Sequence, residues 1–253
     1  MKKFVVSGIF VLILVVTWFG GRSSFVHELW ANWTNPELPP VENINYVGLS
    51  NSNTSTNTNT TTNSSVTPIA AEKNLAVPFT SQAPSANWDQ DHEEFCEEAT
   101  VIMVGGFFGN RGFTSAADAE AALQQVKQWE VDTLGFYYDT TAEETARAIE
   151  SIYDLKVILK KNPTIDDIRR ALSENKLVIV PTAGRELGNP NFKAPGPIYH
   201  NLVIRGYTKD GKFITNDPGT RKGNAYIYKQ SVIMNAMHDW VPSGDRTIPA
   251  NGE

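Results

Sequence analysis

The chain is almost without cysteine: its 253 residues include one, Cys96. A single thiol has no intramolecular disulfide partner. The N-terminal sequence predicts export, and exported proteins rarely keep an unpaired thiol unless its reactivity is used. We therefore take Cys96 as the first candidate functional residue.

The sequence also has no cluster of basic residues and no internal repeat. Acidic residues outnumber basic ones by 28 to 22, which gives a formal net charge of −6. Nucleic acids and anionic lipids bind basic surfaces, so neither is a predicted partner. A metal site built from His92, Glu93 and Cys96 would lack a second ligand pair at zinc-like spacing, and we predict no metal or other cofactor.

The first 21 residues predict a membrane anchor. Lys2 and Lys3 precede an uncharged, mainly apolar run, Phe4–Gly21, which would span about 27 Å as a helix and could cross a bilayer. Residues 16–20 offer no small-x-small cleavage site, so we expect a retained signal anchor. A cleaved signal peptide, which would release a secreted protein, is the alternative. The two lysines should stay in the cytoplasm and leave the rest of the chain on the extracytoplasmic face.

Composition divides the remainder into three parts. Residues 22–74 are predicted to form a stalk whose segment 50–67, almost wholly Asn, Ser and Thr, is a disordered linker. Residues 75–245 have the composition of one globular domain, and residues 246–253 form a tail.

The order of elements within the domain predicts the fold class. We expect helices near 95–109, 115–129, 142–153, 165–175 and 231–240, with strands at 77–79, 156–159, 177–181, 199–207, 212–216 and 226–228. Residues 80–94 have the composition of a loop, and Asp210-Gly211 marks a hairpin. Helices followed by antiparallel strands indicate an α+β fold.

Cys96 stands where a helix is predicted to begin, and a helix N-terminus favours the thiolate over the thiol. Nucleophilic catalysis also needs an imidazole within hydrogen-bond reach. Of the four histidines, His27 lies in the stalk, His92 in the loop and His238 in the last helix. His200 begins a strand and is therefore the best candidate base.

The hairpin gives His200 a predicted partner. Around a two- or four-residue turn at Asp210-Gly211, His200 and Asp217 fall on one face of the sheet, whereas Asn216 falls on the other. With a strict two-residue turn, Asp217 would lie about two positions along its strand beyond the reach of His200. The contact therefore requires a longer loop or a bulge. A three- or five-residue loop would exchange the roles of Asp217 and Asn216.

An acyl-transfer site also needs donors for an oxyanion, commonly the backbone N–H of the nucleophile and a side-chain amide. Two glutamines precede Cys96, namely Gln82 and Gln90. From the residues alone, either could supply the amide.

The order of these residues along the chain resembles that of the papain-like cysteine peptidases: a thiol, then a histidine at a strand start, then an acid after a hairpin. More narrowly, the sequence resembles the bacteriocin-processing, double-glycine type in its stand-alone form, without a transporter. The blocks that carry this likeness are Val77–Gln82, Cys96, His200–Tyr207 and Asn216–Gly219.

The resemblance implies a papain-like fold with N-terminal helices packed on a C-terminal antiparallel sheet. It assigns Cys96 as nucleophile, His200 as general base and acid, Asp217 as the residue that orients the imidazole, and Gln82 as oxyanion donor. Gln90 remains a rival, because it stands six residues before Cys96, as in papain-like enzymes.

The sequence departs from the family in carrying Glu97 and Glu98, where a glycine usually follows the nucleophile. Carboxylates so close would raise the thiol pKa. We expect them either to be solvated residues of the first helical turn or to select basic substrates.

The predicted function is therefore a membrane-anchored, extracytoplasmic thiol hydrolase that cleaves peptide or amide bonds through an acyl-enzyme. Its expected partner is a peptide or protein substrate, and hydrolysis and acyl transfer are both open. The alternative is a catalytically inactive papain-like domain used for surface binding or adhesion.

Overall fold

The computed structural model describes residues 38–44 and 68–242. These belong, from Pro39 on, to one compact unit. The expected anchor at residues 1–21, the linker at 50–67 and the tail at 246–253 lie outside the described residues. Within the described ranges, no helix combines the length and apolar character needed to cross a membrane.

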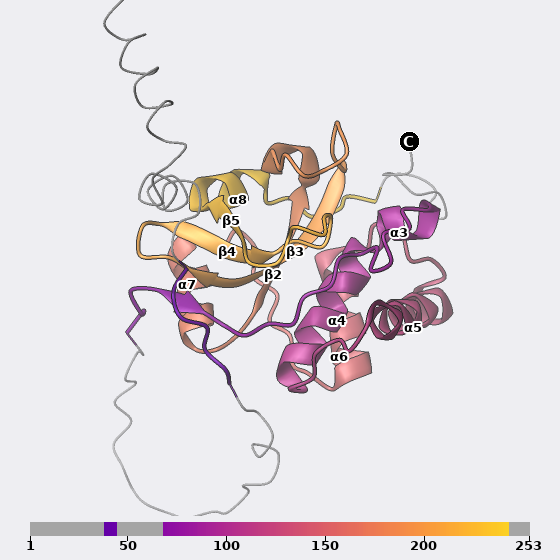
Figure 1. The fold of residues 1–253 in the computed structure, drawn as a ribbon, viewed down its shortest axis with the longest axis horizontal. Coiled ribbons are helices and arrows are strands. Elements are labelled where there is room, and N and C mark those ends of the chain that lie inside the picture. The colour runs from indigo at the N-terminus through magenta and orange to yellow at the C-terminus, as the bar shows by residue number, and fades with distance from the viewer. Residues whose placement is uncertain (1–37, 45–67, 243–253) are drawn as a thin grey trace, which may run out of the picture. The chain divides into compact units, whose positions relative to one another are not determined.

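The fold is α+β, with most helices before most strands, as predicted (Figure 1). In chain order the elements are β1 (Lys73–Asn74), α3 (Gln90–Glu94), α4 (Cys96–Phe108), α5 (Ala116–Leu134), α6 (Ala142–Tyr153), α7 (Ile165–Ser173), β2 (Val178–Ala183), the 3-10 helix η2 (Gly184–Leu187), β3 (Tyr199–Tyr207), β4 (Lys212–Asn216), β5 (Tyr226–Lys229) and α8 (Gln230–Ala236).

Side-chain caps set most of the helix starts. Thr141 and Thr164 each form a capping box at the N-terminus of α6 and α7, and the Ser115 side chain accepts from the backbone N–H of Asp118 at the start of α5. Helix α5 continues past the expected Trp129 and ends before Gly135, which is left-handed at φ 86°. Glycine reaches that conformation without strain and stops the helix.

Two of the expected strands are wrong. Residues 77–79 do not pair in the sheet, because their carbonyl oxygens accept from side chains: Asn216 Nδ2 donates to Val77 O and Pro78 O. The strand that pairs with β3 in this part of the chain is β1, which precedes the expected domain start at residue 75. Residues 156–159 also form no strand, since Ile158 and Leu159 are exposed and bury no apolar face.

One expected loop and one expected helix need correction. The segment expected to be a loop before Cys96 contains the short helix α3, which begins where the Asp89 side chain accepts from the His92 N–H. The last helix, α8, ends at Ala236 and does not reach Trp240.

The sheet is antiparallel, and β3 is its centre. Strand β3 pairs with β4 along one edge, and with β2 and β1 along the other, while β5 pairs with the far edge of β4. Between Ile204 and Gly206 the register of β3 against β4 shifts by one residue, which marks a bulge at Arg205.

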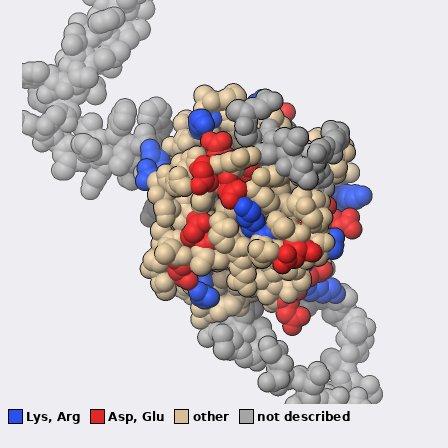
Figure 2. Space-filling model, turned by 90° about the vertical axis from the view of Figure 1, so that its right-hand side faces the viewer, with Lys and Arg blue, Asp and Glu red and all other residues tan. Residues whose placement is uncertain are grey.

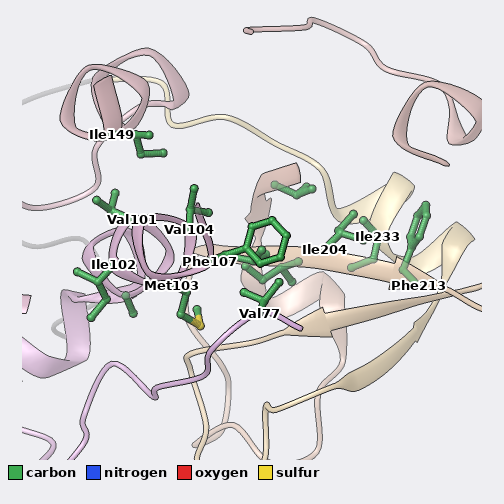
Figure 3. Close-up of a cluster of buried hydrophobic side chains, with 14 of the residues drawn as sticks. Val77, Val101, Ile102, Met103, Val104, Phe107, Ile149, Ile204, Phe213 and Ile233 are labelled. Atoms are coloured by element: carbon green, nitrogen blue, oxygen red, sulfur yellow. The ribbon is translucent and has the colours of Figure 1, made fainter. Parts of the chain in front are cut away.

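Helix α4 occupies the interior, between β3 and the pair α5 and α6 (Figure 1). Eleven of its 13 residues are buried, and its apolar side chains face both the neighbouring helices and the sheet (Figure 3). A helix that is buried on nearly all sides is a core helix. Its first residue, Cys96, is therefore held inside the molecule.

The face in Figure 2 shows acidic and basic side chains interspersed among neutral ones. Phosphate backbones bind to continuous basic surfaces. This face therefore does not have the form of a nucleic-acid site.

Candidate active site

Cys96 is the first residue of α4, as the sequence predicts. Residue Phe95 precedes it without a side-chain cap, so the backbone N–H groups at this helix start are not taken up by a capping side chain. The thiol is 2% exposed, and Cys96 Sγ donates to Glu97 Oε2 at 2.8 Å. Burial raises the pKa of Cys96 well above its ordinary value and the adjacent Glu97 carboxyl raises it further, while the backbone N–H of Asn201 acts in the opposite direction.

His200 is the second residue of β3 and is held by Asp217. The distance from His200 Nε2 to Asp217 Oδ1 is 2.8 Å, and both side chains are buried. Burial pushes the pKa of Asp217 upward, but the charge and hydrogen bond of His200 outweigh it, so this pKa is lowered. Because Asp217 is then ionised, Nε2 carries a proton and donates it, which leaves Nδ1 as the free ring nitrogen.

The bulge at Arg205 is what places His200 and Asp217 on one face. Four residues, 208–211, separate β3 from β4, and the pairs next to this loop are Tyr207 with Phe213 and Gly206 with Ile214. If this register continued along both strands, His200 and Asp217 would lie on opposite faces of the sheet. After the bulge Ile204 pairs with Thr215, so Asp217 becomes a diagonal neighbour of His200 on the same face.

Two further side chains and one backbone N–H fix Asp217, and neither side chain was predicted from the sequence. Asn189 Nδ2 donates to Asp217 Oδ2 at 3.0 Å, and the hydroxyl of Tyr228 donates to the same oxygen at 2.6 Å. Gly219 N donates to Oδ1 at 3.0 Å. Asn189 follows η2 and Tyr228 lies on β5, so only the folded chain brings them to the acid.

Asn216, the alternative partner, lies on the opposite face of β4. Its side-chain amide donates to Val77 O and Pro78 O, and its Oδ1 accepts from the backbone N–H of Ala225. It ties the segment before α3 to the sheet and does not contact His200.

The two glutamines differ sharply in environment. Gln82 is buried, and its Nε2 donates to His92 O at 2.8 Å and to Glu93 O at 3.0 Å. Gln90 is the first residue of α3 and is exposed. Gln82 therefore binds the backbone just ahead of Cys96, with both amide hydrogens in use.

The glutamates beside Cys96 are not solvated, contrary to one expectation from the sequence. Glu97 is 1% exposed and Glu98 is 0% exposed, and Glu130 of α5 lies against Glu98. Burial raises the pKa of Glu97 well above its ordinary value, and the charge of Glu98 raises it further. The sequence did not show that α5 covers this part of α4.

His92 belongs to a separate ionic network. Its Nδ1 lies 2.6 Å from Asp89 Oδ1 and its Nε2 lies 2.8 Å from Glu120 Oε2, which fastens α3 to α5. Across residues 38–44 and 68–242, no group of three or more His, Cys, Asp and Glu side chains is placed to hold a metal ion.

The loop from Gly188 to Ile198 closes the site. The Phe192 ring packs edge-on against the His200 ring, with centroids 5.2 Å apart, and Lys193 Nζ lies 3.0 Å from Glu93 Oε1 of α3. A Cβ on Gly219 would lie 2.8 Å from Phe192 and 2.9 Å from His200, so this position requires glycine. His200 is 1% exposed as a result.

A core helix that begins at a thiol and packs on a sheet carrying an imidazole–carboxylate pair is the architecture of the papain-like class. The chain belongs to the Peptidase_C39 like family, whose sequence model matches residues 74–248. At the family level it is therefore a cysteine peptidase domain. No curated protein matches the chain.

Proposed function

We propose that Cys96, His200 and Asp217 form the catalytic triad of a peptidase that cleaves peptide bonds through an acyl-enzyme. The observation that carries this proposal is the contact between His200 Nε2 and Asp217 Oδ1, at 2.8 Å. It fixes the imidazole so that Nδ1 carries no proton. His200 lies at the start of β3, where the backbone N–H of the next residue, Asn201, hydrogen-bonds the sulfur of Cys96.

The first step is a proton transfer from Cys96 Sγ to His200 Nδ1. The thiol hydrogen points to Glu97 in the structure, so it turns about the Cβ–Sγ bond as the imidazole and sulfur approach. The thiolate attacks the peptide carbonyl carbon, and the imidazolium returns its proton to the leaving amine. Water activated by His200 then releases the acyl group from sulfur. Throughout, ionised Asp217 stabilises the imidazolium.

The carbonyl oxygen becomes negative during attack and needs donors. The backbone N–H of Cys96, at the start of α4, is the first proposed donor. Gln82 is the second, in preference to exposed Gln90, because its buried amide is anchored to the backbone leading to Cys96. To reach an oxyanion, the Gln82 amide must turn away from His92 O or Glu93 O.

The proposal for the whole chain is a stand-alone peptidase of the bacteriocin-processing type, anchored by residues 1–21 with its domain outside the cytoplasm. This location rests on Lys2, Lys3 and the apolar run that follows them. Protease treatment of intact cells tests it: the domain should be digested while a cytoplasmic marker survives. A protected domain would contradict the proposed orientation.

An inactive binding module is the second candidate, and the closed site favours it. Cys96 is 2% exposed and His200 is 1% exposed, so substrate must displace part of their cover, and the loop Gly188–Ile198 covers His200 through Phe192. An active enzyme must therefore open this cover, whereas a binding module need not.

Trapping the acyl-enzyme decides between the two candidates. The full chain is incubated with a mixed peptide library, quenched in acid and analysed by mass spectrometry. We expect an acyl adduct on Cys96 and cleaved peptides, both absent from Cys96→Ser and insensitive to a chelator. A folded protein without adduct or cleavage would leave the binding module as the better account.

A further inference from the structure

We propose that Glu97 is a positioning residue for the Cys96 sulfur: it keeps its own proton and donates that O–H to the thiolate. This rests on the proposed function, in which the thiol proton passes to His200. The sequence showed only that a carboxyl follows the nucleophile; the direct contact of that carboxyl with the sulfur is a property of the fold.

The sulfur of Cys96 is the side-chain partner of this carboxyl, which also accepts from its own backbone N–H. Cys96 Sγ lies 2.8 Å from Glu97 Oε2, and the other oxygen, Oε1, is buried without a hydrogen-bond partner. Glu97 itself is 1% exposed, so water does not share the contact. A negative charge on the Cys96 sulfur would therefore act on the Glu97 carboxyl at contact distance.

The titratable groups that act most strongly on the charge of Glu97 are acidic or neutral. Glu98 lies beside it on α4, Glu130 comes from α5, Asp139 from the segment before α6, and Tyr199 from β3. Among the described residues that act on its charge, none is a cation. A buried carboxylate with no cation and with carboxyl neighbours is strongly disfavoured, so the neutral acid is the stable form.

A neutral Glu97 resolves the conflict between the carboxyl and the nucleophile. A thiolate beside a carboxylate at this distance would place two unscreened negative charges together. When Cys96 instead gives its proton to His200 Nδ1, the O–H of Glu97 turns to the sulfur and donates. The balance is one proton moved from Sγ to Nδ1 and one retained on Glu97, with a single new hydrogen bond, O–H to S⁻.

Iodoacetamide labelling of Cys96 across pH tests this without requiring turnover. Glu97→Gln keeps the shape and a donor but cannot ionise, whereas Glu97→Ala removes the donor. Glu98→Gln is the matched control, because Glu98 is equally buried and makes no hydrogen bond to sulfur in the structure. Thermal melts of each full-length variant report whether it folds.

We expect Glu97→Gln to label within a few-fold of the parent at acid pH. At higher pH it should stay reactive where the parent slows, because the parent loses the Glu97 proton. Glu97→Ala should label about tenfold more slowly at acid pH, the effect of losing one hydrogen bond to a charged group. Glu98→Gln should still slow at higher pH, with the slowing beginning at a lower pH than in the parent, because Glu98 raises the pKa of Glu97.

Two results would overturn the proposal. If Glu97 is instead the base for the thiol, Glu97→Gln will label about a hundredfold more slowly or worse at every pH. If the labelling profile of Glu97→Gln matches the parent at all pH values, Glu97 does not control the sulfur. Peptide cleavage measured on the same samples separates the role of Glu97 from the proposed peptidase function. If the labelling is as expected but no peptide is cleaved, the role of Glu97 stands and the peptidase function is rejected.

Discussion

His200 and Asp217 meet because β3 carries one extra residue. The hydrogen bond of 2.8 Å between them spans β3 and β4, and it depends on the register shift between Ile204 and Gly206. The side chain at the bulge, Arg205, is buried, and burial lowers its pKa to about 10. Its Nη1 lies 3.4 Å from Asn216 Oδ1, so the bulge residue contacts β4 directly.

Replacing Asp217 with Asn should lower kcat/KM by roughly 10²- to 10⁴-fold, because the amide no longer stabilises the imidazolium and favours the wrong tautomer. Steady-state cleavage of a peptide selected from the library measures the effect. Asp210→Asn is the control, since Asp210 lies in the β3–β4 loop and binds Thr208 and Lys212 instead. Equal activity of Asp217→Asn and the parent would remove Asp217 from the mechanism.

Replacing Phe192 with Ala should speed iodoacetamide labelling of Cys96 several-fold at fixed pH. The Phe192 ring covers His200 at a centroid distance of 5.2 Å, and its loss opens the imidazole side of the site. Lys193→Ala should change the rate little, because its ion pair with Glu93 is largely solvated and such pairs contribute about 0–1 kcal/mol. The loop is not the barrier to entry if labelling of Phe192→Ala is unchanged.

Gln82→Ala should destabilise the protein by about 1–3 kcal/mol, since one buried and one partly buried backbone carbonyl would lose a donor. Those carbonyls belong to His92 and Glu93, immediately before the nucleophile. Gln90→Ala, at an exposed position, should stay within about 0.5 kcal/mol of the parent. Urea unfolding followed by tryptophan fluorescence measures both, and equal stabilities would contradict the structural role of Gln82.

His92→Gln should remove stability mainly at low pH. Burial lowers the pKa of His92, but its hydrogen bonds to Glu120 and Asp89 outweigh this, so the folded-state pKa is raised. Such a group stabilises the fold fully below its unfolded pKa of about 6.5, and the contribution is lost as pH rises through the folded value.

The difference in unfolding free energy between the parent and His92→Gln should therefore be larger at pH 5.5 than at pH 8.5. About 1–3 kcal/mol is expected at the lower pH, where both hydrogen bonds involve charged groups. Urea titrations at the two pH values measure it. A difference that is larger at pH 8.5 would show that the imidazole is held neutral.

Local sequence signals predicted most helices well because their ends are set by neighbouring residues. Helix α6 runs from Ala142 to Tyr153 as expected, with a capping box at Thr141. Strands β3 and β4 also have their expected bounds. The strand expected at 156–159 failed because branched residues favour a strand only when a partner edge and a buried face are available.

The sequence by itself determined the class of chemistry: a lone thiol at a helix start, an imidazole at a strand start and an acid beyond a hairpin are all local patterns. Tertiary structure decided what those groups experience. It brought Asn189 and Tyr228 to Asp217, set Phe192 over His200, and buried Glu97 against Cys96. Contacts of this kind join residues distant in sequence or depend on burial, and neither follows from local pattern.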